Sequence, residues 1–191
     1  MTFIFIGRSG SGKGTQASLL IKHLEAKNSG KVFCIETGRY VREFLNRPTY
    51  AGKLAKEINE QGGRQPDFLA VYLWADLLLG QLAGGEHLVF DGTPRSLVEA
   101  QALDTALTFF KISKPKIIFL DASHGCVSDR LRARGRHDDH EEGIKQRLAW
   151  YDRDVAPVVD YYREHKNYDF VSIDAEGTIE AIHDQIKQCC V

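Results

Sequence analysis

The chain has 191 residues, of which 43% are hydrophobic and 27% charged, a composition typical of one globular domain with a hydrophobic core. Its 25 Lys and Arg residues against 26 Asp and Glu residues give a formal net charge of −1, whereas proteins that grip the nucleic acid backbone usually carry a basic surplus. We therefore expect no nucleic acid partner. No apolar run approaches the length of about 18 residues that indicates a transmembrane helix, so we expect no membrane partner either.

The N-terminus and the cysteines are typical of a cytoplasmic protein. Residues 1–7 lack the basic region of a signal peptide and lead straight into a glycine-rich motif. The four cysteines, Cys34, Cys126, Cys189 and Cys190, contain no Cys-x-x-Cys pair. We therefore expect reduced thiols, with neither a zinc site nor a disulfide framework.

Short apolar runs alternate with helical patterns along the chain. After the first run, apolar residues within 13–27 recur at i, i+3, i+4 and i+7 from Ala17, which predicts a helix with one apolar stripe. The predicted buried strands are residues 2–7, 31–35, 87–92, 116–121 and 168–173. Such alternation predicts a parallel sheet in an α/β fold, covered by helices on both faces.

Residues 38–84 interrupt this alternation. They contain patterns for two or three helices and no strand, which is too much for a simple crossover between strands. We expect a helical subdomain at the edge of the sheet. Its last helix, 66–83, begins with Pro66 and ends at a pair of glycines, and it is apolar nearly all round, so we expect it to be buried.

The sequence GRSGSGKGTQ, residues 7–16, follows a predicted strand and opens a predicted helix, which is the context of a phosphate-binding P-loop. Its glycines allow a tight loop with inward N–H groups, the helix N-terminus adds positive potential, and Lys13 can reach the β- and γ-phosphates. A general P-loop has Ser or Thr directly after the lysine, whereas Gly14 stands here and Thr15 follows. The predicted ATP-binding residues of the loop are Gly10, Ser11, Gly12, Lys13, Gly14 and Thr15.

The run GKGT followed by Gln resembles the adenylate kinase family of nucleoside monophosphate kinases. Other segments extend the resemblance in the same order over essentially the whole chain: ETGRYVRE (36–43), FDGTPRS (90–96), DRLRARG (129–135), GRHDDHEEGIKQRL (135–148) and DAEGT (174–178). The resemblance implies a three-layer α/β/α P-loop NTPase fold with a five-stranded parallel sheet, an acceptor-binding helical subdomain at 38–84 and a short lid at 134–139. The implied reaction is reversible, Mg²⁺-dependent transfer of the γ-phosphoryl group of ATP to AMP, giving two ADP.

The resemblance also implies roles for individual residues. On the donor side it places ATP against the P-loop, Arg130, Arg134 and Gly177. On the acceptor side it places the nucleoside monophosphate against Thr37, Arg42, Gln65, Gly92, Arg95, Glu99, Arg136 and Arg147. It implies catalytic roles for Lys13, Arg95, Arg134, Arg136 and Arg147, with Mg²⁺ held through water by Asp91.

Four arginines crowd into RLRARGR, residues 130–136. If 124–134 is helical, Arg130 and Arg134 share one face, while Arg132 lies about 200° away and faces solvent. Phosphoryl transfer needs positioning and neutralisation of charge spread over oxygens, and arginine offers fixed, permanently charged donors for that task. We therefore interpret this stretch as a clamp for a small polyanion.

The departures from the family pattern cluster where the acceptor base would lie. Arg39 stands where adenylate kinases usually have Asp, Thr93 where they have an aromatic or bulky apolar residue, and Glu99 where they have Gln. Arg64 and Gln65 replace apolar residues. A carboxylate only accepts hydrogen bonds, so Glu99 can take one N–H from adenine or cytosine, or two from guanine.

Several alternatives stay open. The acceptor is AMP, or it is GMP or a pyrimidine monophosphate if Glu99 sets the specificity for the base. Alternatively, Glu99 pairs with Arg64 or Arg39 on the surface, and the backbone of the protein reads the base of AMP. The chain could also be a small-metabolite kinase or a catalytically silent nucleotide-binding regulatory module. His124, His137 and His140 match no metal-site spacing. The protein is expected to be a monomer or a small homo-oligomer.

The lid is very short, because only Gly135 separates Arg134 from Arg136; Asp138 and Asp139 are expected to orient these arginines and to hinge the lid. A closed lid excludes water from the donor phosphates. We therefore predict either ATP hydrolysis without acceptor or cover from a neighbouring subunit. Phosphate release together with light scattering checks this, and a monodisperse monomer with no ATPase activity contradicts both.

Overall fold

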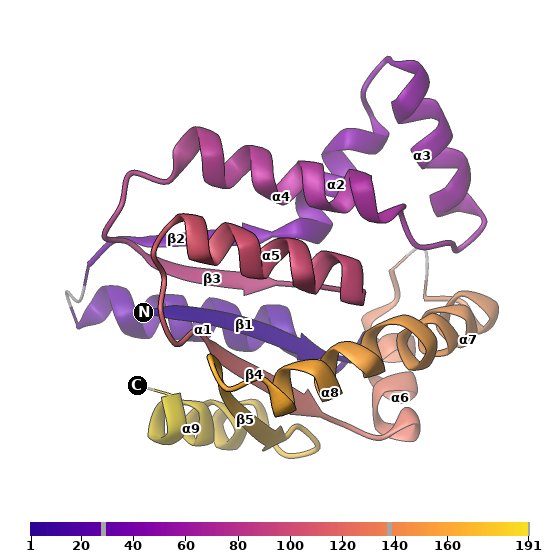
Figure 1. Ribbon diagram of the computed structural model, residues 1–191. Helices are drawn as coiled ribbons and strands as arrows, with labels where there is room; N and C mark the ends of the chain where they lie inside the picture. The colour runs from indigo at the N-terminus through magenta and orange to yellow at the C-terminus, as the bar shows by residue number, and fades with distance from the viewer. Residues whose placement is uncertain (28–29, 137–138, 191) are drawn as a thin grey trace.

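A sheet of five parallel strands lies at the centre of the computed structural model, which describes residues 1–27, 30–136 and 139–190 (Figure 1). Its strands are β1 (Thr2–Gly7), β2 (Val32–Glu36), β3 (His87–Asp91), β4 (Lys116–Asp121) and β5 (Asp169–Asp174), in the spatial order β2-β3-β1-β4-β5. Each strand lies within one residue of its predicted range, so the strand predictions are confirmed. The register aligns Phe5 of β1 with Asp91 of β3 and Ile118 of β4.

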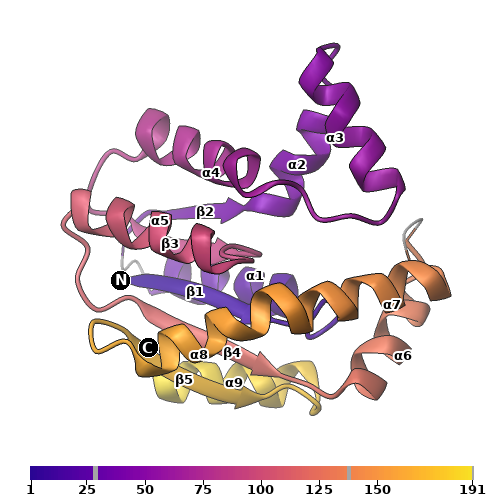
Figure 2. The same cartoon turned by 45° about the vertical axis from the view of Figure 1, so that its right-hand side comes forward.

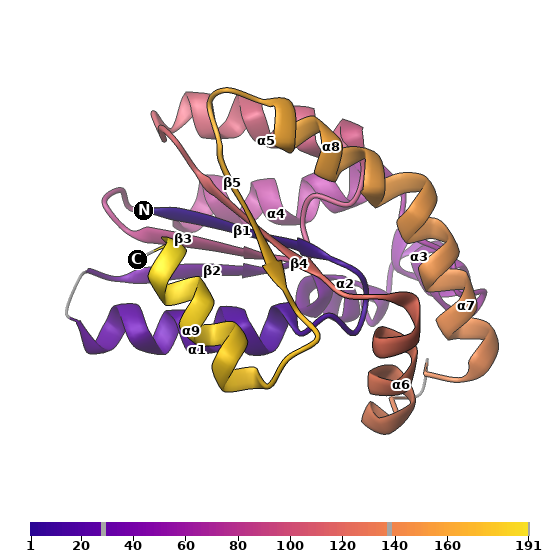
Figure 3. The same cartoon turned by 90° about the horizontal axis from the view of Figure 1, so that it is seen from below.

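Helices cover both faces of the sheet and make a three-layer α/β/α arrangement (Figure 3). One layer contains α1 (Lys13–Ala26) and α9 (Ile179–Cys190), and the other contains α4 (Asp67–Gln81), α5 (Leu97–Phe109) and α8 (Ala156–Glu164). Because side chains alternate along a strand, Phe3 and Phe5 of β1 join the core cluster on the α1 side, and Ile4 and Ile6 join the cluster on the α4 side. Continuous apolar runs are therefore needed in these strands, as the sequence shows.

Two helices stand away from the sheet next to its β2 edge (Figure 1). They are α2 (Thr37–Leu45) and α3 (Tyr50–Glu60), and with α4 they make up the predicted helical segment. A separate small core of Phe44, Ala55, Leu69 and Leu73 joins α2 and α3 to the start of α4. The rest of α4, including Trp74, packs on the sheet. This helix therefore contributes to the small core and to the core beside the sheet.

The prediction that the last helix of this segment is buried holds for one of its faces and is wrong for the other. Leu78 is 2% exposed and lies in the core, but its neighbour Leu79 is 70% exposed, and Phe68 and Tyr72 are exposed as well. The helix contacts the sheet along one side only. Apolar residues on its opposite side therefore face solvent, although the sequence alone shows no amphipathic contrast.

Helices beyond the carboxyl end of the strands carry the lid segment (Figure 2). α6 (His124–Arg134) matches its predicted range, and α7 (Glu141–Trp150) continues through a π-helical turn, η1 (Tyr151–Val155), into α8. The predicted lid at 134–139 lies between α6 and α7; His137 and Asp138 are outside the described residues.

None of the helices in the described part of the chain is long and apolar enough to cross a bilayer. The four cysteines are free thiols in the structure.

Adjacent leucines on α4 test the assignment of its buried face. Because Leu78 lies in the core and Leu79 faces solvent, we expect Leu78→Ala to lower the free energy of unfolding by about 2–5 kcal/mol. The matched Leu79→Ala change should lower it by less than about 0.5 kcal/mol. Urea denaturation of both variants measures the difference, and equal losses would show that the helix packs otherwise.

Candidate functional site

The loop between β1 and α1 has the geometry of an anion cradle. Gly10 and Gly12 have φ angles of 87° and 95°, a left-handed conformation that side chains disfavour. A Cβ on Gly10 would also lie 2.8 Å from a backbone oxygen of α6. The first turn of α1 contains no acidic residue that could satisfy its N–H groups. Its N-terminus is therefore suited to binding phosphate oxygens.

The predicted ATP-binding residues of this loop lie together at the start of α1. Lys13 folds back over the loop, and its Nζ donates to the carbonyl oxygens of Gly7 and Arg8, both at 2.8 Å. The Ser11 hydroxyl is buried and has no hydrogen-bond partner within the described residues. Thr15, at the open side of the helix end, is exposed.

Several charged groups surround Lys13. Burial lowers the pKa of Lys13 to about 8; Asp91 opposes this shift, and Arg95 and Arg134 add to it. Burial raises the pKa of Asp91, opposed chiefly by Lys13 and Arg95 and also by Arg136. The structure thus brings predicted residues from the P-loop, the loop after β3 and the lid within electrostatic reach of one another.

Asp91 also lies against the start of α1, because a Cβ on Gly14 would meet its Oδ2 at 3.1 Å. The exposed hydroxyl of Thr15 is on the residue after that glycine. Carboxylate and hydroxyl oxygens close to a phosphate cradle are the donors that Mg²⁺ prefers, usually with several waters kept in its shell. These residues therefore fit a hydrated Mg²⁺ ion.

The loop after β3 holds a second, half-buried cation. Arg95 Nε donates to the carbonyl oxygen of Gly92 at 2.7 Å, and burial lowers the pKa of Arg95. Thr37, the first residue of α2, shares a 2.7 Å hydrogen bond with the hydroxyl of Thr93. Arg42 also contributes to the lowered pKa of Arg95, so the two arginines lie within electrostatic reach of one another.

Two other predicted acceptor residues have protein partners. Arg42 Nη2 lies 3.1 Å from Glu36 Oε1, and both side chains are about half exposed. The Gln65 side chain donates from Nε2 to the carbonyl oxygen of Ala55 at 2.9 Å. Gln65 therefore packs towards α3.

Asp139 ties the lid arginines together. Its carboxylate accepts from Arg134 at 2.8 and 2.7 Å, from Arg147 at 2.7 Å, and from the backbone N–H of Arg136 at 2.9 Å. Burial acts to raise the pKa of Asp139, but the hydrogen bonds from Arg134 and Arg147 hold it well below its usual range. The predicted contact between Asp139 and these arginines is present; Asp138 lies outside the described residues.

The remaining arginines of this stretch separate as the helical spacing predicts. Arg130 donates to the carbonyl oxygens of Ala175 at 2.6 Å and Gly177 at 3.3 Å, so it joins α6 to the loop before α9. Arg132 is exposed and pairs with Glu141 at 2.7 Å. The expectation that Arg132 faces solvent is confirmed.

The sequence matches known proteins over nearly its whole length. The family model described as "Adenylate kinase" matches residues 5–167. The chain belongs to the adenylate kinase family. It is 34% identical over 192 residues to "Adenylate kinase" of Parabacteroides distasonis, covering 98% of this chain and 96% of that protein. It is 33% identical over 184 residues to "Adenylate kinase 1" of Nostoc sp. (strain PCC 7120), covering 96% and 95%. The predicted resemblance and the P-loop fold are confirmed, and the chain is a nucleoside monophosphate kinase.

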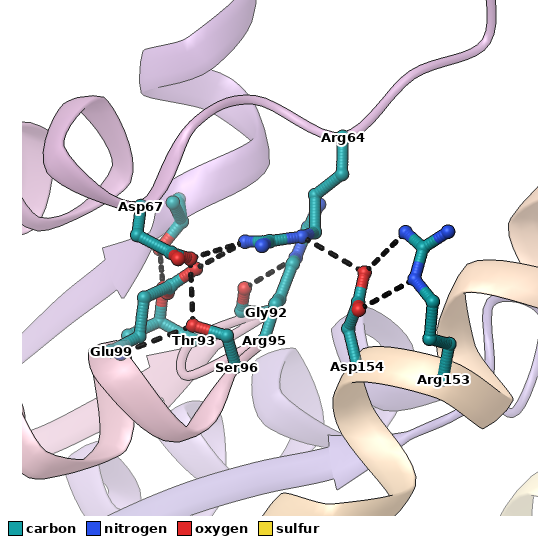
Figure 4. Close-up of polar contacts among 10 residues, drawn as sticks. Arg64, Asp67, Gly92, Thr93, Arg95, Ser96, Glu99, Arg153 and Asp154 are labelled. Carbon is teal, nitrogen blue, oxygen red and sulfur yellow. Dashed lines mark hydrogen bonds and ion pairs between the residues drawn. The ribbon is translucent and has the colours of Figure 1, made fainter.

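The kinase carries a partly buried ionic cluster beside the loop after β3 (Figure 4). Arg64 lies 2.6 Å from Asp67, 3.4 Å from Glu99 and 3.3 Å from Asp154. The Glu99 side chain is 1% exposed, so the expectation of a surface ion pair with Arg64 is wrong: the two residues pair in the interior. Arg39 instead contacts Tyr40 and Glu43 on its own helix.

Sequence reasoning did not predict that the π-helical turn contacts both Arg64 and the P-loop. Its Asp154 pairs with Arg64, and its Asp152 lies 3.4 Å from Arg8 of the P-loop. The guanidinium of Arg8 also lies 4.8 Å from the centre of the Tyr151 ring. An arginine inside a glycine-rich loop was the available signal, but nothing in the sequence shows where its partner lies.

The bridge made by Asp139 predicts a pH-dependent contribution to stability. Because its pKa is lower in the folded kinase than in the unfolded chain, the stabilisation is present above about pH 4 and is lost as the pH falls towards the folded pKa. We expect Asp139→Asn to lower the free energy of unfolding at pH 7 by about 1–3 kcal/mol and to flatten its decline in acid.

Urea denaturation at pH 7 and pH 3 measures this effect. Asp129→Asn is the matched control, because that carboxylate is 80% exposed and pairs with Arg132 at the surface. A loss in Asp139→Asn no larger than in the control would contradict the bridging role.

Proposed function

We propose that this kinase transfers the γ-phosphoryl group of ATP reversibly to AMP, with Mg²⁺, giving two ADP. One observation carries the proposal: Lys13, Arg95 and Arg134 come from three separate segments and lie close enough to shift one pKa, that of Lys13. Like charges repel, so such a group needs an anion to occupy it. Two nucleotides whose phosphates meet end to end supply that anion.

The P-loop side suits the donor. Residues 10–15 would surround the β- and γ-phosphates of ATP, with Lys13 leaving its two carbonyl partners for the phosphate oxygens. Arg130 holds the loop that contains Gly177, and both would lie against the adenine of ATP. Asp91 would hold Mg²⁺ through water, and a bound Mg²⁺ neutralises phosphate charge.

The loop after β3 suits the acceptor. Arg95 and Arg42 would bind the phosphate of AMP, and Thr37, Gln65, Gly92 and Glu99 would surround its nucleoside. Arginine forks match the oxygens of a phosphate group. The Gln65 side chain is held by α3, so its contribution would come from its backbone.

The transfer step needs no covalent intermediate. The bond from the γ-phosphorus to the oxygen that bridges it to the β-phosphate breaks, and its electron pair stays on ADP. A bond forms from the γ-phosphorus to a phosphate oxygen of AMP. Arg134, Arg136 and Arg147, gathered on Asp139, would stabilise the charge on the transferred group.

Family membership supports this enzyme over the small-metabolite kinase and the silent regulatory module. The two half-buried cations Lys13 and Arg95 support an acceptor that itself carries a phosphate.

Two neighbouring arginines on α6 test the proposal. Arg134 is held towards the site by Asp139, whereas Arg132 is exposed and pairs with Glu141. We expect Arg134→Ala to lower kcat for ATP and AMP by about 10³-fold or more. The matched Arg132→Ala should stay within about threefold of the parent rate, because its side chain is solvated.

A coupled assay of ADP formation with Mg²⁺, ATP and AMP measures both variants. Equal rates for Arg134→Ala and the parent protein would contradict the proposed role of Arg134 in phosphoryl transfer. If the parent protein forms no ADP, the proposed reaction is overturned.

A further inference from the structure

Glu99 is a buried carboxylate with spare capacity for hydrogen bonds. It lies in the first turn of α5, where its backbone N–H donates to the Ser96 hydroxyl. Its side chain is 1% exposed, yet its contacts with Arg64 and with the Thr93 hydroxyl are long, at 3.4 and 3.5 Å. The backbone of Arg95 supplies one further hydrogen bond. Two carboxylate oxygens offer about four acceptor positions, so these contacts leave room for stronger donors.

Glu99 lies close to residues that are proposed to bind the acceptor nucleotide. It lies one helical turn after Arg95, the residue proposed to bind the acceptor phosphate. Its Thr93 contact belongs to the wall formed by the Thr37 and Thr93 hydroxyls, at 2.7 Å. A nucleotide whose phosphate lies on Arg95 and whose sugar passes this wall presents its base to Glu99.

Arg64 lies beside Glu99, with its Nη1 atom 3.4 Å from the carboxylate (Figure 4). Its short contact is with Asp67, at 2.6 Å, and Asp154 holds it from the other side at 3.3 Å. Moving away from Glu99 therefore costs Arg64 only its weakest contact. A base with its own pair of donors could take that place on the carboxylate.

Guanine is the base with the required pattern. Its N1–H and N2–H groups are adjacent donors, arranged as in the guanidinium that already lies on Glu99. Its O6 atom, next to N1, can accept from Arg64, as guanine O6 accepts from arginine elsewhere. Adenine and cytosine offer one amino group beside a ring nitrogen that repels a carboxylate, and uracil and thymine offer one N–H between two carbonyl oxygens.

We infer that GMP is a second phosphoryl acceptor of this kinase, with Glu99 accepting from N1–H and N2–H of guanine and Arg64 donating to O6. The inference rests on the proposed function for the reaction itself, and adds to it the base that the acceptor pocket reads. The bond changes are those of the AMP reaction, so the products are ADP and GDP.

The protonation state of Glu99 then sets the balance between the two acceptors. A neutral Glu99 can donate its O–H to adenine N1 and accept from adenine N6, whereas a charged Glu99 suits guanine. Burial raises the pKa of Glu99; Arg95 and Arg64 oppose this and Asp67 adds to it, while Asp154 faces the far side of Arg64. The preference for GMP over AMP should therefore grow as the pH rises.

The test compares kcat/KM for AMP and GMP, with ATP and Mg²⁺, in the parent protein, Glu99→Gln and Asp67→Asn. Glutamine keeps the local helix cap, since Gln serves at this position as Glu does, but it presents an N–H donor to guanine. We expect the GMP to AMP ratio to fall about 10- to 100-fold in Glu99→Gln and to lose its pH dependence. Asp67→Asn loosens Arg64, the inferred donor to O6, so it should lower the ratio by less than Glu99→Gln does and should keep its pH dependence.

The outcomes separate the inference from the proposed function. Phosphorylation of AMP but not of GMP by the parent protein overturns the inference and leaves the proposed function standing. Phosphorylation of neither overturns both. Equal shifts in Glu99→Gln and Asp67→Asn overturn the role of Glu99 as the reader. If Glu99→Gln fails to fold, GMP turnover by the parent protein and its rise relative to AMP with pH decide the question.

Discussion

Two acidic residues, Asp91 and Asp139, hold the cationic groups of this kinase in a small volume beyond the carboxyl ends of the strands. Asp139 binds two arginines from helices on either side of the lid segment. Asp91 offsets part of the burial cost of Lys13. The charge gathered there still includes Arg95, whose Nε donates to its own loop. In the proposed function the phosphates of the two nucleotides balance this charge.

The parallel sheet makes this gathering possible. Adjacent parallel strands end at one edge, so the P-loop after β1 and the Gly92–Arg95 loop after β3 become neighbours although about 80 residues separate them in sequence. The continuous helical segment of α7, η1 and α8 contacts the P-loop and the loop that precedes α4. Its Asp152 faces Arg8 of the P-loop, and its Asp154 faces Arg64. One turn of π-helix thus contacts segments from the donor and acceptor sides.

The sequence was sufficient where a local pattern has one structural solution. Continuous apolar runs predicted the strands, and the helical spacing placed Arg132 in solvent. It was insufficient where burial depends on distant segments. The apolar helix α4 exposes Leu79 because only one of its faces meets the sheet. Glu99 is internal because Arg64, from the loop before α4, closes over it, and no spacing within the sequence shows that contact. The roles of the individual arginines stay predictions.

Phosphate binding and base reading have separate physical origins in this protein. Arginine forks bind any phosphate, whichever base is attached. The base is distinguished by the pattern of donors and acceptors that a few buried groups present, and a buried carboxylate beside a guanidinium is a specific pattern. If Glu99 reads the acceptor base as inferred, substitutions around it change the acceptor without disturbing the transfer chemistry.

The most direct test of the central claim is to supply the protein with ADP and Mg²⁺ alone and follow all nucleotides and inorganic phosphate by ³¹P NMR. A reversible kinase with two nucleotide sites predicts ATP and AMP in equal amounts, with no inorganic phosphate from the transfer. Unchanged ADP, or AMP and inorganic phosphate formed without ATP, would contradict it.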